Sequence, residues 1–152
     1  MKRLSLAFLL VFLLPALAGA APLDTLDQKG LDKLVAEHQG KVIMLNFFAT
    51  WCPPCRMEIP DLQKVHKAYE NKNVVVIGLS VDEDKSAVPA FLQKLGVTYP
   101  VYMATRDLTR TFGISSIPFN VFFDRKGKVV LAGTGLVEYK DLVEIFDKLL
   151  ED

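Results

Sequence analysis

The stretch that decides the fold is residues 42–60, VIMLNFFATWCPPCRMEIP. Its first seven residues form an apolar run that is too short for a membrane span. Such a run predicts a strand that is buried on both faces, as in a parallel sheet. A helix is expected from Pro53 to about Tyr69, because apolar residues recur there along one stripe. The cysteines Cys52 and Cys55 therefore lie where a buried strand gives way to a helix.

Outward from this stretch, predicted strands and helices alternate along the chain. In chain order we expect a short helix ending near Gly40, a strand at 74–79, a helix at 88–95, a short strand at 100–103, a helical turn at 108–112, strands at 119–123 and 128–131, and a closing helix at 142–150. The last two strands flank a short turn that contains a glycine, which is typical of a β-hairpin. Alternating elements followed by an antiparallel hairpin predict a three-layer α/β fold with a mixed central sheet.

Length and composition limit the possible functions. The chain has 152 residues, of which 51% are hydrophobic and 24% charged, so disorder and a coiled coil are disfavoured. Its 18 basic and 18 acidic side chains give no net charge and hence no basic surface for nucleic acid. Two cysteines are too few for a disulfide-stapled mini-protein or a four-thiolate zinc site. They suffice for one redox pair.

The first twenty residues have the pattern of a secretory signal peptide. Lys2 and Arg3 precede an apolar run at 4–14, and the small residues 18–20 fit the cleavage motif. The run is shorter than a spanning helix needs, so a permanent anchor is disfavoured. The chain would then contact a membrane only through this segment, and only if it stayed uncleaved.

Cleavage after Ala20 would leave a single domain at residues 21–152, since no repeat or internal linker is visible. Residues 1–20 hold two bases and no acid, so the mature domain would carry 16 bases against 18 acids, a net charge of −2. It would work in the periplasm or another extracytoplasmic space. Cysteine pairs in such oxidising surroundings are disulfides unless another protein reduces them.

The spacing of the cysteines assigns each a different role. With Cys52 at the N-cap, Pro53 and Pro54 fall at N1 and N2, where proline removes no intrahelical hydrogen bond. Cys55 falls at N3, whose backbone N–H is a donor for the N-cap side chain. This bond and the helix dipole would lower the pKa of the Cys52 thiol. We therefore expect Cys52 to be an exposed nucleophile and Cys55, one turn further on, to be the resolving thiol.

Other uses of the cysteine pair are less consistent with the sequence. A purely structural disulfide would close too short a loop to remove much chain entropy from the unfolded state. A zinc site needs further ligands, and neither His38 nor His66 stands at the usual short spacing. Haem attachment needs a histidine directly after the second cysteine, where this chain has Arg56. We expect no metal and no cofactor.

The string from Asn46 to Pro60 resembles the thioredoxin superfamily, in particular its extracytoplasmic TlpA/ResA/CcmG(DsbE)-like branch. The resemblance extends over residues 23–150 and includes Pro60, which matches the proline that follows the active site within the helix. It implies a thioredoxin-like α/β/α fold with a TlpA-type β-α insert at 74–102. Many cytoplasmic thioredoxins carry a buried aspartate where this chain has Asn46, and an amide cannot accept the proton of Cys55.

The resemblance also supplies candidate substrate-binding residues. Ile117-Pro118 matches the cis-proline loop, which lies against the cysteines and pairs with the substrate backbone in this family. Gly135 matches the glycine that completes the substrate groove. An aromatic directly before the first cysteine is expected to shield the thiolate and contact a partner peptide. The candidate residues are Trp51, Pro53, Pro54, Ile117, Pro118 and Gly135.

Glu58 is a third candidate catalytic residue beside the two cysteines. It lies three residues after Cys55, on the same side of the predicted helix, and matches the active-site glutamate of ResA-type proteins. One hypothesis is that partial burial raises the pKa of Glu58, which then helps to deprotonate Cys55. The alternative is a surface glutamate that the helix dipole stabilises.

The resemblance implies a thiol–disulfide oxidoreductase, of the kind that reduces protein disulfides in cytochrome c maturation or metal-centre assembly. Its partners would be a disulfide-bonded protein and a membrane thiol-transporting reductase as electron donor; we expect a monomer. One alternative is a disulfide-forming folding oxidase, which needs a more stabilised thiolate. Another is a Cu(I) chaperone that binds the metal through its two thiolates.

Overall fold

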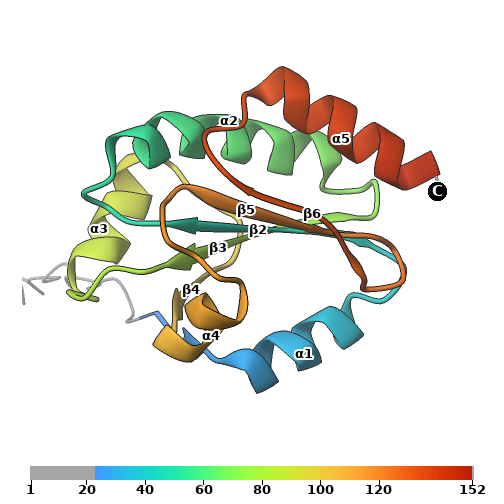
Figure 1. The fold of residues 1–152 in the computed structure, drawn as a ribbon. Coiled ribbons are helices and arrows are strands. Elements are labelled where there is room, and N and C mark those ends of the chain that lie inside the picture. Colours follow the sequence, from blue (N-terminus) through green and yellow to red (C-terminus); the bar gives the residue numbers. More distant parts are fainter. Residues whose placement is uncertain (1–22, 152) are drawn as a thin grey trace, which may run out of the picture.

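The apolar run of the deciding stretch forms strand β2 (Val42–Phe48), in which all seven residues are buried. In the computed structural model, β2 pairs in parallel with β3 (Val74–Ser80) and antiparallel with β5 (Phe119–Phe123). The strand order is β1-β4-β3-β2-β5-β6, so β2 is interior. Helices cover both of its faces (Figure 1), which explains why the strand is apolar almost throughout.

The sheet is completed by three strands at its two sides. Strand β1 is missing from the sequence-based expectation, because two residues are too few to show a periodic pattern. The expected hairpin is present, and its second strand extends to Thr134 instead of ending at 131. The remaining strands are β1 (Thr25–Leu26), β4 (Val101–Ala104) and β6 (Val129–Thr134).

Within residues 23–151, five helices form the outer layers, as the alternating pattern predicts. Helices α1 and α4 pack on one face of the sheet, and α2, α3 and α5 pack on the other (Figure 1). The three-layer fold with a mixed sheet is therefore confirmed. The helices are α1 (Gln28–Glu37), α2 (Pro53–Tyr69), α3 (Ala87–Lys94), α4 (Arg106–Thr111) and α5 (Tyr139–Glu151).

The region where the insert is expected, residues 74–102, folds as a strand–helix–strand unit. It comprises β3, α3 and the first half of β4, and the two strands are parallel neighbours. Helix α3 contributes Val88 and Leu92 to an apolar cluster that also contains Cys52 and Cys55. This unit therefore forms part of the packing around the cysteines.

The structure describes residues 23–151. The predicted signal peptide at 1–20 and its cleavage site after Ala20 lie outside these residues and stay predictions. Within 23–151, no helix combines the length and the apolar character that crossing a membrane requires.

Candidate active site

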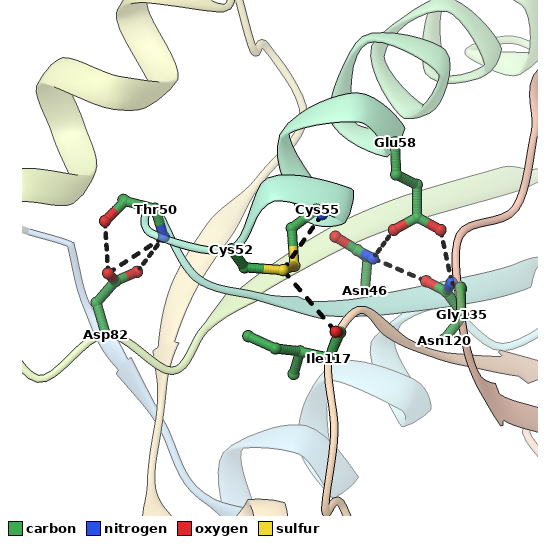
Figure 2. The surroundings of a disulfide bond; sticks show 9 residues. All are labelled: Asn46, Thr50, Cys52, Cys55, Glu58, Asp82, Ile117, Asn120 and Gly135. Atoms are coloured by element: carbon green, nitrogen blue, oxygen red, sulfur yellow. Dashed lines mark hydrogen bonds between the residues drawn. A yellow bond between two sulfur atoms is a disulfide. The ribbon is translucent and has the colours of Figure 1, made fainter.

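Helix α2 begins as the residue types at its start dictate. Cys52 is the N-cap, with extended backbone angles, and its Sγ accepts a hydrogen bond from the Cys55 backbone N–H at 3.2 Å. Pro53 and Pro54 occupy N1 and N2. The N-cap assignment is confirmed, and the side chains of Cys52 and Cys55 form a disulfide whose Cα atoms lie 5.3 Å apart (Figure 2).

The expectation that Cys52 is exposed is wrong for this disulfide form. Only 3% of Cys52 is exposed, and Cys55 is fully buried. Cys52 packs among apolar residues that include Ala49, and Ile117 is packed against the same cluster. The Sγ of Cys52 lies 3.8 Å from the Ile117 carbonyl oxygen. The loop before Pro118 therefore covers the sulfur of Cys52. The position of Cys52 in the sequence does not predict this contact.

The Ile117–Pro118 peptide bond is cis, as the resemblance implies. Gly135 lies beside this segment, since its N–H donates a hydrogen bond to the Pro118 carbonyl oxygen at 2.9 Å. The residue has a φ of 121°, a region that favours glycine. The structure thus brings Cys52, the cis-proline segment and Gly135 together from distant parts of the chain.

Trp51 stands out of the surface next to the disulfide, with 67% of the residue exposed. It lines an open pocket of about 240 Å³ together with Ile117 and the loop residues 114–116. Gly135 lines a different hollow, which it shares with Asn120 and Val137. The candidate substrate-binding residues Trp51 and Ile117 therefore line one hollow and Gly135 lines another.

Glu58 is completely buried behind the disulfide, so the alternative of a surface glutamate is wrong. Its carboxylate accepts three hydrogen bonds. Oε2 accepts one from Asn46 Nδ2 at 2.7 Å, and Oε1 accepts one from Asn120 Nδ2 at 2.7 Å and one from the Val137 N–H at 2.9 Å. Burial raises the pKa of Glu58 above its ordinary value, and the bonds from Val137, Asn120 and Asn46 oppose this rise.

Asn120 belongs to this network and is absent from the sequence-based candidates. It lies directly opposite Asn46 in the antiparallel pairing of β2 with β5, and Asn46 Nδ2 donates to Asn120 Oδ1 at 2.8 Å. Asn120 Nδ2 also donates to the Gly135 carbonyl oxygen at 3.2 Å. The available signal was one asparagine in the middle of each of two otherwise apolar strands.

Asp82 is a second missed residue, on the other side of the cysteines. It follows β3 and is 9% exposed. Its carboxylate accepts bonds from the Thr50 N–H at 3.0 and 3.2 Å and from the Thr50 hydroxyl at 2.6 Å. The Ser80 hydroxyl also donates to it at 2.8 Å. Asp82 thereby fixes the loop that leads to Cys52 (Figure 2).

The described residues contain no group of three or more His, Cys, Asp or Glu side chains placed to hold a metal ion. The site presents a sulfur pair with a buried carboxylate beside it.

A helix-capping cysteine disulfide, set against a cis-proline loop at the end of a central strand, defines the thioredoxin-like thiol–disulfide oxidoreductases. The comparisons with known proteins agree. The Redoxin family model matches residues 14–148, and the chain belongs to this family. It is a thioredoxin-superfamily protein of the ResA/CcmG-like kind, and the enzyme class is thiol–disulfide oxidoreductase.

Three relatives illustrate the similarity. The thiol-disulfide oxidoreductase ResA of Geobacillus thermodenitrificans is 28% identical over 124 residues, which are 81% of this chain and 71% of that protein. ResA of Bacillus subtilis is 33% identical over 110 residues, covering 72% of this chain and 62% of the relative. A thioredoxin-family thiol:disulfide interchange protein from Chlorobium tepidum TLS has a crystal structure with a TM-score of 0.72 and 37% identity, covering 76% and 83% of the two chains.

Proposed function

We propose that this protein reduces disulfides of other proteins outside the cytoplasm, with Cys52 as the nucleophile and Cys55 as the resolving thiol. The observation that carries the choice of Cys52 as the nucleophile is the hydrogen bond from the Cys55 N–H to Cys52 Sγ at the start of α2. A backbone donor and the positive end of the helix dipole both stabilise a thiolate on Cys52. Cys55 is deeper and lies at N3, where it has no such donor in the cap.

The exchange transfers two electrons in two steps. The Cys52 thiolate attacks one sulfur of the partner disulfide; the partner S–S bond breaks, a mixed disulfide forms, and the second partner sulfur leaves as a thiolate that takes up a proton. Cys55 then loses its proton and attacks Cys52 Sγ, which releases the first partner sulfur. Cys52 and Cys55 end as the observed disulfide, and the partner ends as a dithiol.

The partner would bind around the covered sulfur. Trp51 and Ile117 line the pocket next to Cys52, where the ring can contact an extended peptide. Pro53 and Pro54 lie at the exposed start of α2, and Pro118 and Gly135 lie on the other side of the disulfide. Because Cys52 is 3% exposed, attack requires the partner or the reduced state to open the contact with Ile117.

The setting of this activity is also part of the proposal. The signal-peptide pattern at 1–20 supports an extracytoplasmic site of action, in the periplasm or an equivalent space. The ResA relatives and the resemblance to the CcmG branch favour a reductant for cytochrome c maturation or metal-centre assembly. A membrane thiol-transporting reductase would then re-reduce the pair. The protein would act as a monomer.

The assignment of the two cysteines can be tested by trapping. The Cys55→Ser variant keeps the nucleophile and cannot resolve a mixed disulfide, so it should accumulate covalent complexes with disulfide-bonded proteins. The Cys52→Ser variant is the matched control and should accumulate far fewer. Complexes that form equally with both variants, or only with Cys52→Ser, would contradict the assignment. Two assays of the wild-type protein separate a reductant from a folding oxidase. A reductant should reduce the disulfide of a test protein, whereas a folding oxidase should oxidise a reduced test protein.

A further inference from the structure

The side-chain oxygen of Asn46 is a buried polar atom that has no partner among the described residues. Asn46 is completely buried, and its Oδ1 accepts no hydrogen bond. Its Nδ2, in contrast, donates to Glu58 Oε2 at 2.7 Å and to Asn120 Oδ1 at 2.8 Å. Buried acceptors are rarely left unpaired, because they lose their water without compensation.

The orientation of the Asn46 amide is fixed by its neighbours. Both groups that Nδ2 contacts, the Glu58 carboxylate and Asn120 Oδ1, are acceptors. Rotating the amide by half a turn would place Oδ1 against these two oxygens and lose both bonds. The unpaired oxygen must therefore point away from Glu58 and Asn120.

The direction in which Oδ1 points is toward the cysteines. Side chains alternate along β2, and Met44 and Phe48, on either side of Asn46, both pack on the α2 face. Phe48 belongs to the same apolar cluster as Cys55. Figure 2 shows Nδ2 of Asn46 directed at Glu58 and Asn120, and Oδ1 on the side of the amide that faces Cys55.

We propose that Asn46 is a positioning residue for the exchange reaction, whose Oδ1 accepts a hydrogen bond from the Cys55 thiol in the reduced protein. The inference rests on the proposed function, since it concerns the dithiol state. A dithiol donor is oxidised to its own disulfide and supplies two electrons and two protons. The Cys52–Cys55 S–S bond breaks, one proton binds to Cys55 Sγ, and the other is released to water when Cys52 is the thiolate. In the disulfide neither sulfur carries a proton, so Oδ1 has no donor in the present structure.

Two consequences follow from this bond. First, it stabilises the neutral thiol of Cys55, so that the proton stays on Cys55 while Cys52 is the thiolate. Second, it is present only in the reduced state, while the oxidised state keeps an unpaired buried acceptor. Asn46 therefore favours the dithiol and makes the reduction potential of the pair less negative than it would be without the amide.

The titratable and polar groups around Cys55 and Glu58 come from several parts of the chain. Cys52 caps α2, and Glu58 lies within that helix. Tyr99, from the segment before β4, is buried, and its pKa is raised first by this burial and further by the charge of Glu58. From β5 the facing polar group is the uncharged Asn120. Asp82, after β3, is bonded to Thr50 on the far side of Cys52. Glu58 is therefore the charge that must be separated from the effect of Asn46.

The test is the titration of Cys55 in a Cys52→Ser background, followed by the ultraviolet absorbance of the thiolate. Replacing Asn46 by Ala removes the acceptor and should lower the Cys55 midpoint by about one pH unit, a tenfold change in thiolate fraction. Replacing Asn46 by Asp keeps an acceptor and adds negative charge, so the midpoint should rise. Unchanged midpoints, or shifts of both variants in one direction, would overturn the proposal.

Two controls separate Oδ1 from the rest of the network. Asn120→Ala also removes a donor to Glu58 but leaves Oδ1 in place, and it should move the Cys55 midpoint less than half as far. In a Glu58→Gln background the carboxylate no longer titrates, and the shift caused by Asn46→Ala should persist. Loss of the shift in that background would assign the effect to Glu58 and overturn the proposal.

The reduction potential gives a second readout that does not depend on the Cys52→Ser background. In the otherwise wild-type protein, Asn46→Ala should shift the equilibrium with glutathione toward the disulfide by up to tenfold. The reduction potential of the pair would then be about 30 mV more negative. An equal or less negative potential would contradict the inference. Failure of the proposed function looks different: the wild-type protein would then not reduce a protein disulfide, whatever the titration of Cys55.

Discussion

Two buried carboxylates lie on opposite sides of the disulfide, and the protein holds them in different ways. Glu58 lies inside the fold, where two asparagine side chains and one backbone N–H bind it. Asp82 lies near the surface and binds the backbone and hydroxyl of Thr50, in the loop that leads to Cys52. Both are satisfied by several donors, as buried acids must be.

The difference lies in what each carboxylate is connected to. Glu58 is linked through Asn46 and Asn120 to the sheet and to Gly135, beside the cis-proline segment. Its burial raises its pKa above the ordinary value of a glutamate. Asp82 accepts hydrogen bonds from Ser80, at the end of β3, and from Thr50, just beyond β2. We therefore assign proton control at Cys55 to the Glu58 side and loop positioning at Cys52 to the Asp82 side.

The largest effect expected from this comparison is the loss of stability in Glu58→Ala. The substitution leaves three donors without their acceptor, two of them on buried asparagine side chains, and the oxidised protein should lose about 3–5 kcal/mol of unfolding free energy at neutral pH. Urea unfolding measures this loss. Glu70→Ala, at the exposed end of the same helix, is the control and should remain close to wild type. A loss of unfolding free energy below about 1 kcal/mol would contradict a structural role for Glu58.

A smaller loss is expected for Asp82→Ala. Thr50 keeps partial access to water, so the unpaired N–H costs about 1–3 kcal/mol. The pH titration of Cys55 should stay at its wild-type midpoint, because Asp82 faces the loop and not the resolving thiol. The adjacent exposed Glu83 provides the matched control, Glu83→Ala. If Asp82→Ala moved the Cys55 midpoint as far as Glu58→Gln does, the division of roles between the two carboxylates would be wrong.

The smallest effect concerns the pH dependence of stability. A raised carboxyl pKa means that the folded state binds the Glu58 proton more tightly than the unfolded state does. Relative to Glu58→Gln, the stability of the oxidised wild type should therefore be greatest below about pH 4.5 and fall as pH rises toward the folded pKa. The slope in that window is about 1.4 kcal/mol per pH unit. A difference that stays constant or grows with pH would contradict the raised pKa.

The sequence predicts the elements of the site better than their mutual contacts. The N-cap position of Cys52 follows from local rules for prolines and helix starts, and the structure agrees. The burial of Cys52 by Ile117 does not follow from local rules, because the two residues are 65 positions apart and meet only in the folded chain. The missed partnership of Glu58 with Asn120 has the same cause.

The contact between Asp82 and Thr50 follows from the order of the strands in the sheet. Phe48 and Ser80 are register partners in the parallel strands β2 and β3, so Thr50 and Asp82 each lie two residues beyond the same edge of the sheet. A hydroxyl and a carboxylate at that edge are natural partners. Pairing of β2 with β3 was not predicted from the sequence, and without it the relation between the two residues could not be seen.

The most direct test of the central claim, that the cysteine pair is a reductant of protein disulfides, is the reduction potential of Cys52–Cys55 in equilibrium with glutathione. The two prolines at the start of α2 leave Cys52 few backbone donors, and the structure has one within the helix cap. We therefore predict a potential below about −200 mV. A value near −120 mV, roughly where strong thiol oxidants lie, would contradict the account.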